Sequence, residues 1–173
     1  MRLFNSSKSF IYENNDYKKL LRFGRKRGIG RRRQASIRKE KLLHISQRPI
    51  SANNRSRMGH WERDGMYGAN KKQLLVCIER KTRLVRIEKM NSTRAQDVHN
   101  LTSKALKKDK VLSITNDNGT EFRRPHLSKY PIYYCDPMKP NQRGSVENVI
   151  GSLRRLIKRT TDLEGMTDKR VKE

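Results

Sequence analysis

Three acidic residues, Asp64, Asp117 and Glu147, stand at positions where catalysis could use them. Asp64 follows a first expected strand, Asp117 comes directly after a later one, and Glu147 falls in the first turn of an expected helix. Carboxylate oxygens bind hard Mg²⁺ or Mn²⁺, and two such ions can activate the attacking oxygen and stabilise the leaving oxygen of a phosphodiester. The three carboxylates are therefore candidate ligands of two divalent ions in phosphodiester cleavage.

Each carboxylate also has an ordinary structural explanation. The run 116–119, Asn-Asp-Asn-Gly, is a favourable turn sequence because Asn and Asp before Gly favour positive φ. Glu147 would complement the dipole at a helix N-terminus, and Asp64 taken alone indicates nothing. The catalytic interpretation depends on all three residues occupying sensible positions in a strongly basic chain.

The segments that must position these carboxylates alternate between strand and helix patterns. Strands are predicted by a compact apolar run at 74–80, an alternating run at 84–90 and short β-rich runs at 111–115 and 131–135. With the segment around Trp61, the first two runs suggest an antiparallel meander. Apolar residues at helical spacing predict helices at about 93–108 and 145–159. This order predicts an α/β fold, a mixed sheet with flanking helices that is compatible with an RNase H-like sheet.

Charge is the strongest compositional signal in this chain of 173 residues, which is the size of about one domain. The net charge is +25 and the pI is near 10.7, values that indicate a polyanionic partner, most commonly nucleic acid. From Lys18 to Lys41 the chain carries twelve Lys or Arg and one acid. We expect residues 1–50 to be a basic, poorly ordered segment, with a solvated linker as the alternative. Its predicted DNA-binding residues are Arg25, Lys26, Arg27, Arg31, Arg32 and Arg33.

The cysteines, the histidines and the lengths of the apolar runs exclude several classes of protein. Cys77 and Cys135 lack CxxC spacing and are expected to be buried free thiols, as in a reducing cytosol. None of the four histidines pairs with a cysteine at zinc-finger spacing, and His60 beside Trp61 is better explained as a core residue than as a substrate contact. No apolar run approaches the length of a membrane span. We therefore expect a cytoplasmic protein with no membrane partner.

Four blocks of the sequence are similar to a known family. ISQRPISANNRSRMGHWERD (45–64), IERKTR (78–83), TNDNGTEF (115–122) and the run 133–163, which contains CDPMKPNQRGSVEN, resemble in order successive blocks of the insertion sequence 30 family of bacterial transposases. The similarity covers roughly residues 31–165. It implies an RNase H-like integrase catalytic core at 51–165, preceded by a remnant of a DNA-binding region and linker at 1–50 and followed by a truncated tail at 166–173.

The resemblance implies a chemistry and a set of site residues. Asp64, Asp117 and Glu147 match the family's DDE positions, which implies two Mg²⁺ (or Mn²⁺) ions, nicking at the transposon end and attack of the freed 3′-hydroxyl on target DNA. The expected partners are transposon-end and target DNA in the bacterial nucleoid, bound by a homodimer or higher oligomer. Residues expected to surround the carboxylates are Glu62, Asn118, Glu121 and Asn148. Residues expected to bind DNA are Gln142, Arg143, Arg154, Arg155 and Lys158.

The chain departs from the family's pattern in several places. Lys139-Pro140-Asn141 stands where relatives usually have Ser-Pro-Trp, and Arg63 stands where Gly is common. Family members resemble one another over roughly twice this length. The alternative function is therefore a catalytically incompetent transposase fragment that only binds DNA. A basic RNA-binding protein is a third possibility, supported by composition alone.

Overall fold

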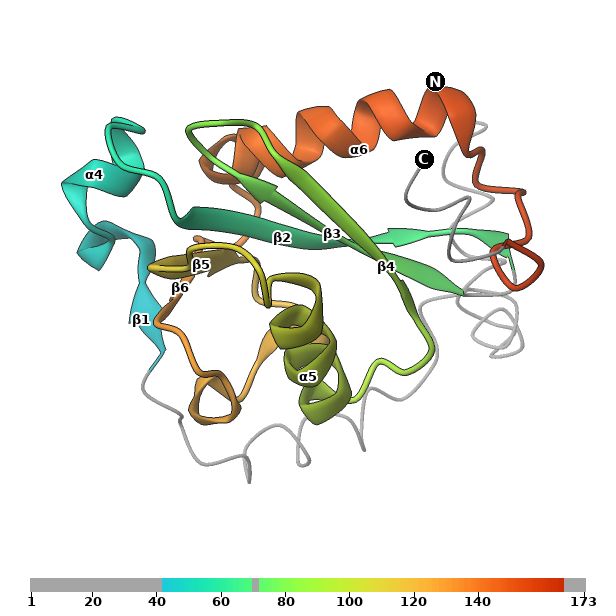
Figure 1. Ribbon diagram of the computed structural model, residues 1–173, viewed down its shortest axis with the longest axis horizontal. Helices are drawn as coiled ribbons and strands as arrows, with labels where there is room; N and C mark the ends of the chain where they lie inside the picture. The colour runs from blue at the N-terminus through green and yellow to red at the C-terminus, as the bar shows by residue number, and fades with distance from the viewer. Residues whose placement is uncertain (1–41, 70–71, 167–173) are drawn as a thin grey trace, which may run out of the picture. The chain divides into compact units, whose positions relative to one another are not determined.

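The computed structural model describes residues 42–69 and 72–166. The predicted DNA-binding residues Arg25, Lys26, Arg27, Arg31, Arg32 and Arg33 lie outside the described residues, as does most of the predicted tail. The described strands form one mixed sheet in the spatial order β1-β6-β5-β2-β3-β4 (Figure 1).

One half of the sheet is an antiparallel meander and the other half is parallel. The meander consists of β2 (His60–Tyr67), β3 (Gln73–Glu79) and β4 (Val85–Met90), as the sequence predicts. β5 (Ser113–Asn116) pairs with β2 in parallel, and β6 (Ile132–Tyr134) pairs with β5 in the same direction. This mixed topology is the predicted RNase H-like sheet.

The sheet buries both of its faces. In β3, where successive side chains point to opposite faces, Leu75 and Cys77 join one core cluster while Leu74, Val76 and Ile78 join the other. Helix α5 (Ala95–Ala105) covers the first cluster and α6 (Gly144–Leu156) the second, on opposite sides of the sheet (Figure 1). Every residue of β3 is buried, which explains its uninterrupted apolar run.

Both long helices are shorter than their sequence patterns predict. α5 begins after Arg94, and Ser92 Oγ accepts a hydrogen bond from the N–H of Arg94 in a local turn instead of capping the helix. α6 ends at Leu156 because Ile157 adopts an extended conformation, with φ −116° and ψ 95°. Apolar spacing continues past both ends because the following residues still pack on the core. Sequence periodicity therefore overestimates the helix lengths.

Short elements complete the domain. β1 (Leu43–His44) pairs in parallel with β6, so the sheet starts before residue 51, where the sequence places the start of the core. Two residues are too few to show a strand period, which is why no pattern marks β1. Further short helices are η2 (Ile45–Gln47), α4 (Ile50–Asn53), η4 (Thr120–Phe122), η5 (Pro125–Leu127) and η6 (Pro140–Arg143). Across 42–69 and 72–166, none of the helices has both the length and the apolar character that crossing a bilayer requires.

Candidate active site

The parallel pairing of β2 and β5 brings two of the candidate carboxylates together. Glu62 of β2 lies opposite Thr115 of β5, and continuing this register by two residues places Asp64 opposite Asp117. Asp117 directly follows β5, as predicted. Asp64 differs from its prediction, because it lies inside β2 and pairs with Val76, whereas the sequence suggested that it follows the strand. The polar residues Glu62, Arg63 and Asp64 interrupt the apolar pattern of β2, so the sequence does not show that the strand continues here.

A single guanidinium joins all three candidate carboxylates. Arg143, the last residue of η6, places Nη1 2.9 Å from Asp64 Oδ2. Its Nη2 lies 3.6 Å from Asp117 Oδ2 and 3.9 Å from Oε1 of Glu147, which occupies the first turn of α6 as predicted. Only 11% of the Arg143 side chain is exposed. Residues that are 79 positions apart in the sequence, from Asp64 to Arg143, thus meet in one cluster.

The cluster holds more negative charge than its arginine neutralises. Burial raises the pKa of Asp64 above its usual value; Arg143 opposes this effect and the charge of Asp117 adds to it. Burial also raises the pKa of Glu147, again opposed by Arg143 and reinforced by Asp64. Burial disfavours the charged form of Arg143, but the carboxylates of Asp64 and Asp117 outweigh it and raise the pKa of that guanidinium. Three carboxylates and one guanidinium leave a formal charge of −2 when all are ionised.

These residues fit a divalent cation in donor type and in charge. The oxygens are hard ligands of the kind that Mg²⁺ and Mn²⁺ prefer, and a divalent ion would balance the residual charge. Within the described ranges, no three acidic, histidine or cysteine side chains lie close enough together to coordinate one ion as they stand. The guanidinium of Arg143 lies among the three carboxylates. An ion at this place would compete with the guanidinium of Arg143 for the same carboxylate oxygens.

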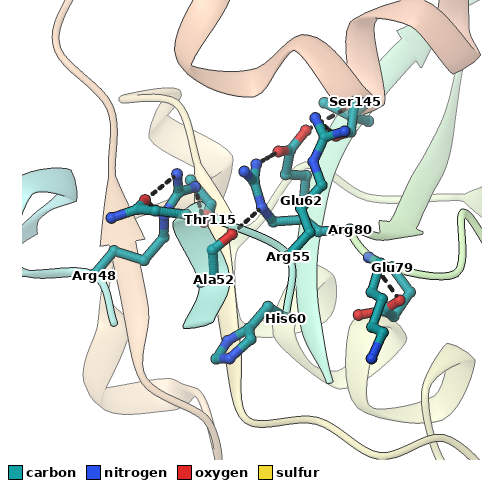
Figure 2. A network of polar contacts seen from close by, with 12 residues as sticks. Arg48, Ala52, Arg55, His60, Glu62, Glu79, Arg80, Thr115 and Ser145 are labelled. Carbon is teal, nitrogen blue, oxygen red and sulfur yellow. Dashed lines mark hydrogen bonds and ion pairs between the residues drawn. The ribbon is translucent and has the colours of Figure 1, made fainter. Parts of the chain in front are cut away.

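Glu62, predicted to surround the carboxylates, connects β2 to α6. Its buried carboxylate forms an ion pair with Arg80 and accepts a hydrogen bond of 2.9 Å from the N–H of Val146 in the first turn of α6. Arg80 in turn donates from Nε to the carbonyl oxygen of Ala52 in α4 (Figure 2). An anion at this helix end is favourable because it meets free N–H groups and the positive end of the dipole. Glu62 thereby fixes the helix turn that carries Glu147.

The next residue, Arg63, connects β2 to β5 and α5 on the opposite face of β2. Its fully buried guanidinium donates from Nε to Asn116 Oδ1 at 2.9 Å and from Nη1 to Thr102 Oγ1 at 2.6 Å. It also lies 5.0 Å from the centroid of the Phe122 ring. Burial lowers the pKa of Arg63 to about 10. Asn116 directly precedes Asp117, so Arg63 ties β2 to the end of β5 that carries the second carboxylate.

Three further predicted neighbours lie close to Asp117 or Glu147. Asp117 Oδ1 accepts a hydrogen bond from the N–H of Gly119, which bends the chain after β5, but none of residues 116–119 has the positive φ that the turn interpretation expected. Asn118 donates from Nδ2 to the carbonyl oxygen of Cys135, which joins the ends of β5 and β6. A Cβ at position 119 would come within 2.9 Å of Glu121 Oε2 and 3.0 Å of Asp117 Oδ1, so glycine lets these acids approach. Asn148 follows Glu147 on α6.

The loop before η6 is organised around Asp136, which sequence analysis did not single out. Gln142, predicted to bind DNA, accepts from the N–H of Asp136 and donates to its Oδ2. His44 Nε2 and Lys139 Nζ lie 2.7 and 3.0 Å from the same carboxylate. These contacts, that of His44 first, lower the pKa of Asp136. The amide of Gln142 is thus engaged in holding the loop that leads to Arg143.

A hollow of about 470 Å³ opens beside Asp64 and Glu147. Arg154, a predicted DNA contact, lines it and is partly buried, whereas Arg155 and Lys158 are exposed and do not line it. Gly151 also lines the hollow, and the structure adds lining residues that the sequence does not indicate, Tyr67 and Arg159. Their participation depends on how α6 lies over the end of β2, which no local pattern reveals.

Several residues considered from the sequence have structural roles. His60 is buried, with Nδ1 2.8 Å from Ser113 Oγ and Nε2 3.0 Å from Ser51 Oγ, which confirms the core interpretation. Cys77 and Cys135 are buried free thiols, as predicted. Burial raises their pKa values to about 12 and about 11, respectively.

Comparison with known proteins relates the chain to bacterial transposases. It is 37% identical over 150 residues to the transposase for insertion sequence element IS1086 of Cupriavidus metallidurans, which covers 82% of this chain and 43% of that protein. It is 33% identical over 131 residues to transposase InsI for insertion sequence element IS30A of Escherichia coli, covering 71% and 34%. The transposase for IS4351 of Bacteroides fragilis is 32% identical over 137 residues, covering 75% and 42%.

Two further comparisons gave different results. No family model matches the chain. Among solved structures, the catalytic core domain of BIV integrase aligns with a TM-score of 0.48 at 24% identity, covering 56% of this chain and 66% of that one.

The sheet topology is that of the RNase H-like class. The chain is homologous to bacterial insertion-sequence transposases of the IS30 type. It spans less than half the length of these relatives.

Proposed function

We propose that this chain carries the catalytic core of a DDE transposase, which cuts and joins DNA by phosphoryl transfer. The observation that carries the proposal is the convergence of Asp64, Asp117 and Glu147 on one guanidinium, that of Arg143. Homology to the transposases supports it independently, because that similarity extends along the chain and does not depend on side-chain geometry. The net charge of +25 is suited to a DNA substrate.

The three carboxylates are the proposed ligands of two Mg²⁺ or Mn²⁺ ions. Bound there, the ions would supply Lewis-acid activation of the attacking oxygen and neutralise charge on the leaving oxygen. In the first reaction, water attacks a phosphorus atom and the bond to the 3′-oxygen breaks, so a 3′-hydroxyl is released. In the second, that hydroxyl attacks a target phosphodiester and displaces another 3′-oxygen. Asp64 from β2, Asp117 after β5 and Glu147 from α6 would hold the ions at the reacting phosphate.

Arg143 has one proposed role in the structure without DNA and another when DNA is bound. In the described structure its charge relieves the repulsion among the carboxylates. With DNA bound, we expect the side chain to leave the carboxylates and to donate to phosphate oxygens, as a planar guanidinium does well. The partners proposed for the whole assembly are transposon-end and target DNA, bound by a homodimer or larger oligomer in the bacterial cytoplasm.

A plasmid-nicking assay tests the proposal. The chain is incubated with supercoiled plasmid and increasing Mg²⁺ or Mn²⁺, and the nicked form is quantified over time. We expect metal-dependent nicking that falls by roughly a thousandfold in Asp64→Asn, equivalent to about 4 kcal/mol of transition-state stabilisation. The matched control is Asp97→Asn, which removes an exposed acid from α5 on the opposite face of the sheet. Equal nicking by the wild type and Asp64→Asn would contradict the proposal.

A DNA-binding fragment without nuclease activity is the competing function. The charge of +25 would by itself account for such a protein. It predicts DNA binding that weakens steeply with salt and no nicking with any divalent ion. A gel-shift titration run beside the nicking assay separates the two functions.

A further inference from the structure

We propose that the hollow beside Asp64 and Glu147 binds an unpaired nucleotide of the DNA strand that flanks the cleaved phosphodiester. This inference rests on the proposed function and adds a subsite to it. The hollow, about 470 Å³, lies in the size range of pockets that accept small organic groups. Asp64 and Glu147 line one part of it, so a group bound there is next to the reacting phosphate.

Gly151 shows that the space over α6 is not needed for packing. It lies in the middle of an exposed helix face, one turn after Glu147, where glycine weakens a helix. A Cβ added at Gly151 would meet nothing within 4 Å apart from its chain neighbours and its own helix. Gly65, which also lines the hollow, differs because a Cβ there would lie 2.5 Å from Gln73 Oε1. The Gln73 side chain would thus have to move for a side chain at position 65, whereas nothing packs over Gly151, whose missing side chain keeps the hollow open.

Two arginines supply positive charge away from the carboxylates. Arg154 lies two helical turns after Glu147, about 10 Å along the axis of α6. Its Nη1 is buried and has no hydrogen-bond partner among the described residues. Burial, and then the nearby charge of Arg159, lowers the pKa of Arg154. Because DNA rises about 3.4 Å per nucleotide in one strand, this separation suits a phosphate beyond the reacting one.

Tyr67 provides a surface for a base. It ends β2, lines the same hollow and is 50% exposed. Bases stack on exposed aromatic rings without regard to sequence, and an arginine-lined groove commonly follows the backbone of the same strand. Bases within a duplex already stack on one another, which is why the expected ligand is an unpaired nucleotide.

DNA binding in Ca²⁺, measured by fluorescence anisotropy at one salt concentration, tests the subsite. The two probes are a blunt duplex and the same duplex with a short 3′ single-stranded extension that contains 2-aminopurine. We expect the wild type to bind the extended probe at least tenfold more tightly and to quench 2-aminopurine. In Gly151→Leu the affinities for the two probes should differ by no more than twofold. Tyr67→Ala loses quenching, and Tyr67→Phe restores it.

Matched variants separate the subsite from folding. Leucine is a better helix former than glycine, so Gly151→Leu should unfold no more easily than the wild type. Ser152→Leu adds the same side chain at an exposed neighbour that does not line the hollow, and it should keep the tenfold preference. Arg154→Gln should weaken binding of the extended probe. The slope of log K against log salt concentration should also become shallower, by about the contribution of one phosphate contact.

The outcomes distinguish this inference from the proposed function. Equal binding of the two probes by the wild type, or a preference that survives in Gly151→Leu, would overturn the nucleotide subsite. If metal-dependent nicking persists in that case, the proposed function stands without it. A wild-type chain that shows the preference but does not nick DNA would support the subsite and overturn the proposed function.

Discussion

The two faces of β2 use buried charge in different ways. On the face toward α6, Glu62 is neutralised by Arg80, and two positions further along Asp64 shares Arg143 with two more carboxylates. On the face toward α5, Arg63 has hydrogen bonds and an aromatic ring as partners. The first face therefore gathers acids around arginines, whereas the second holds one cation among neutral groups.

The difference separates the residues that hold the elements of the candidate site in place from the cluster that we propose does the chemistry. Glu62 and Arg63 are almost completely buried and fix α6 and β5 in place. Asp64, Asp117 and Glu147 lie further toward solvent, with 21%, 38% and 35% of their side chains exposed. Charge that is compensated inside the protein supports the fold. Charge that is left partly uncompensated at the surface is what a cation and a phosphate can use.

Removing Glu62 should have the largest effect on stability. In Glu62→Ala, Arg80 remains buried without its carboxylate and the N–H of Val146 loses its acceptor. We expect a loss of about 3–5 kcal/mol in the free energy of unfolding, measured with urea. Glu62→Gln keeps an acceptor for Val146 and should lose less. Equal stability of Glu62→Ala and the wild type would show that this connection does not hold α6.

Removing Arg63, the cation on the opposite face of β2, should lower the free energy of unfolding by less. Arg63→Met leaves Asn116 and Thr102 without a donor, but it also removes a buried charge whose Nη2 has no hydrogen-bond partner among the described residues. We expect a loss of about 1–2 kcal/mol in the same urea experiment. A loss as large as that of Glu62→Ala would remove the distinction between the two faces.

Replacing Arg143 should strengthen metal binding. In Arg143→Gln the carboxylates lose their shared positive charge, so a divalent ion no longer competes with a guanidinium. We expect the Kd for Mn²⁺, measured by electron paramagnetic resonance of the free ion, to fall about tenfold, equivalent to about 1.4 kcal/mol. An unchanged or weaker affinity would argue that Arg143 leaves room for the ion where it stands.

The smallest effect concerns pH. The folded chain raises the pKa of Glu147, so it binds this proton more tightly than the unfolded chain does. The resulting stability is present below the ordinary Glu pKa of about 4.3 and is lost as the pH rises through the raised value. Relative to Glu147→Gln, the wild type should therefore lose a few tenths of a kcal/mol between about pH 4 and pH 7, a small change because the side chain is one-third exposed. A pH-independent difference would contradict this.

Sequence patterns located the strands of the meander and the positions of Asp117 and Glu147. Apolar periodicity identifies β3 and α6 because these elements pack on the core. The bend after β5 is visible because Asp117 accepts a hydrogen bond from Gly119 and a side chain at position 119 would crowd two acids, although the expected positive φ is absent. The sequence predicts that Asp64 follows a strand, whereas it lies inside β2, because polar residues within β2 break the strand pattern.

Other features of the site depend on contacts between distant segments. Arg143 was expected to bind DNA, and only the approach of η6 to β2 reveals its contact with Asp64. The roles of Tyr67 and Arg159 follow from where α6 crosses the sheet. No spacing in the sequence encodes these distances, because they result from how the elements pack.

The claim that the three carboxylates bind divalent cations together is tested most directly by calorimetric titration of Mn²⁺ into the wild type, Asp117→Asn and the control Asp97→Asn. Asp117 reaches the cluster from β5, whereas Asp97 is exposed on α5. We predict that Asp117→Asn weakens Mn²⁺ binding at least tenfold and that Asp97→Asn leaves it unchanged. Equal affinities in all three proteins would contradict a metal site at Asp64, Asp117 and Glu147.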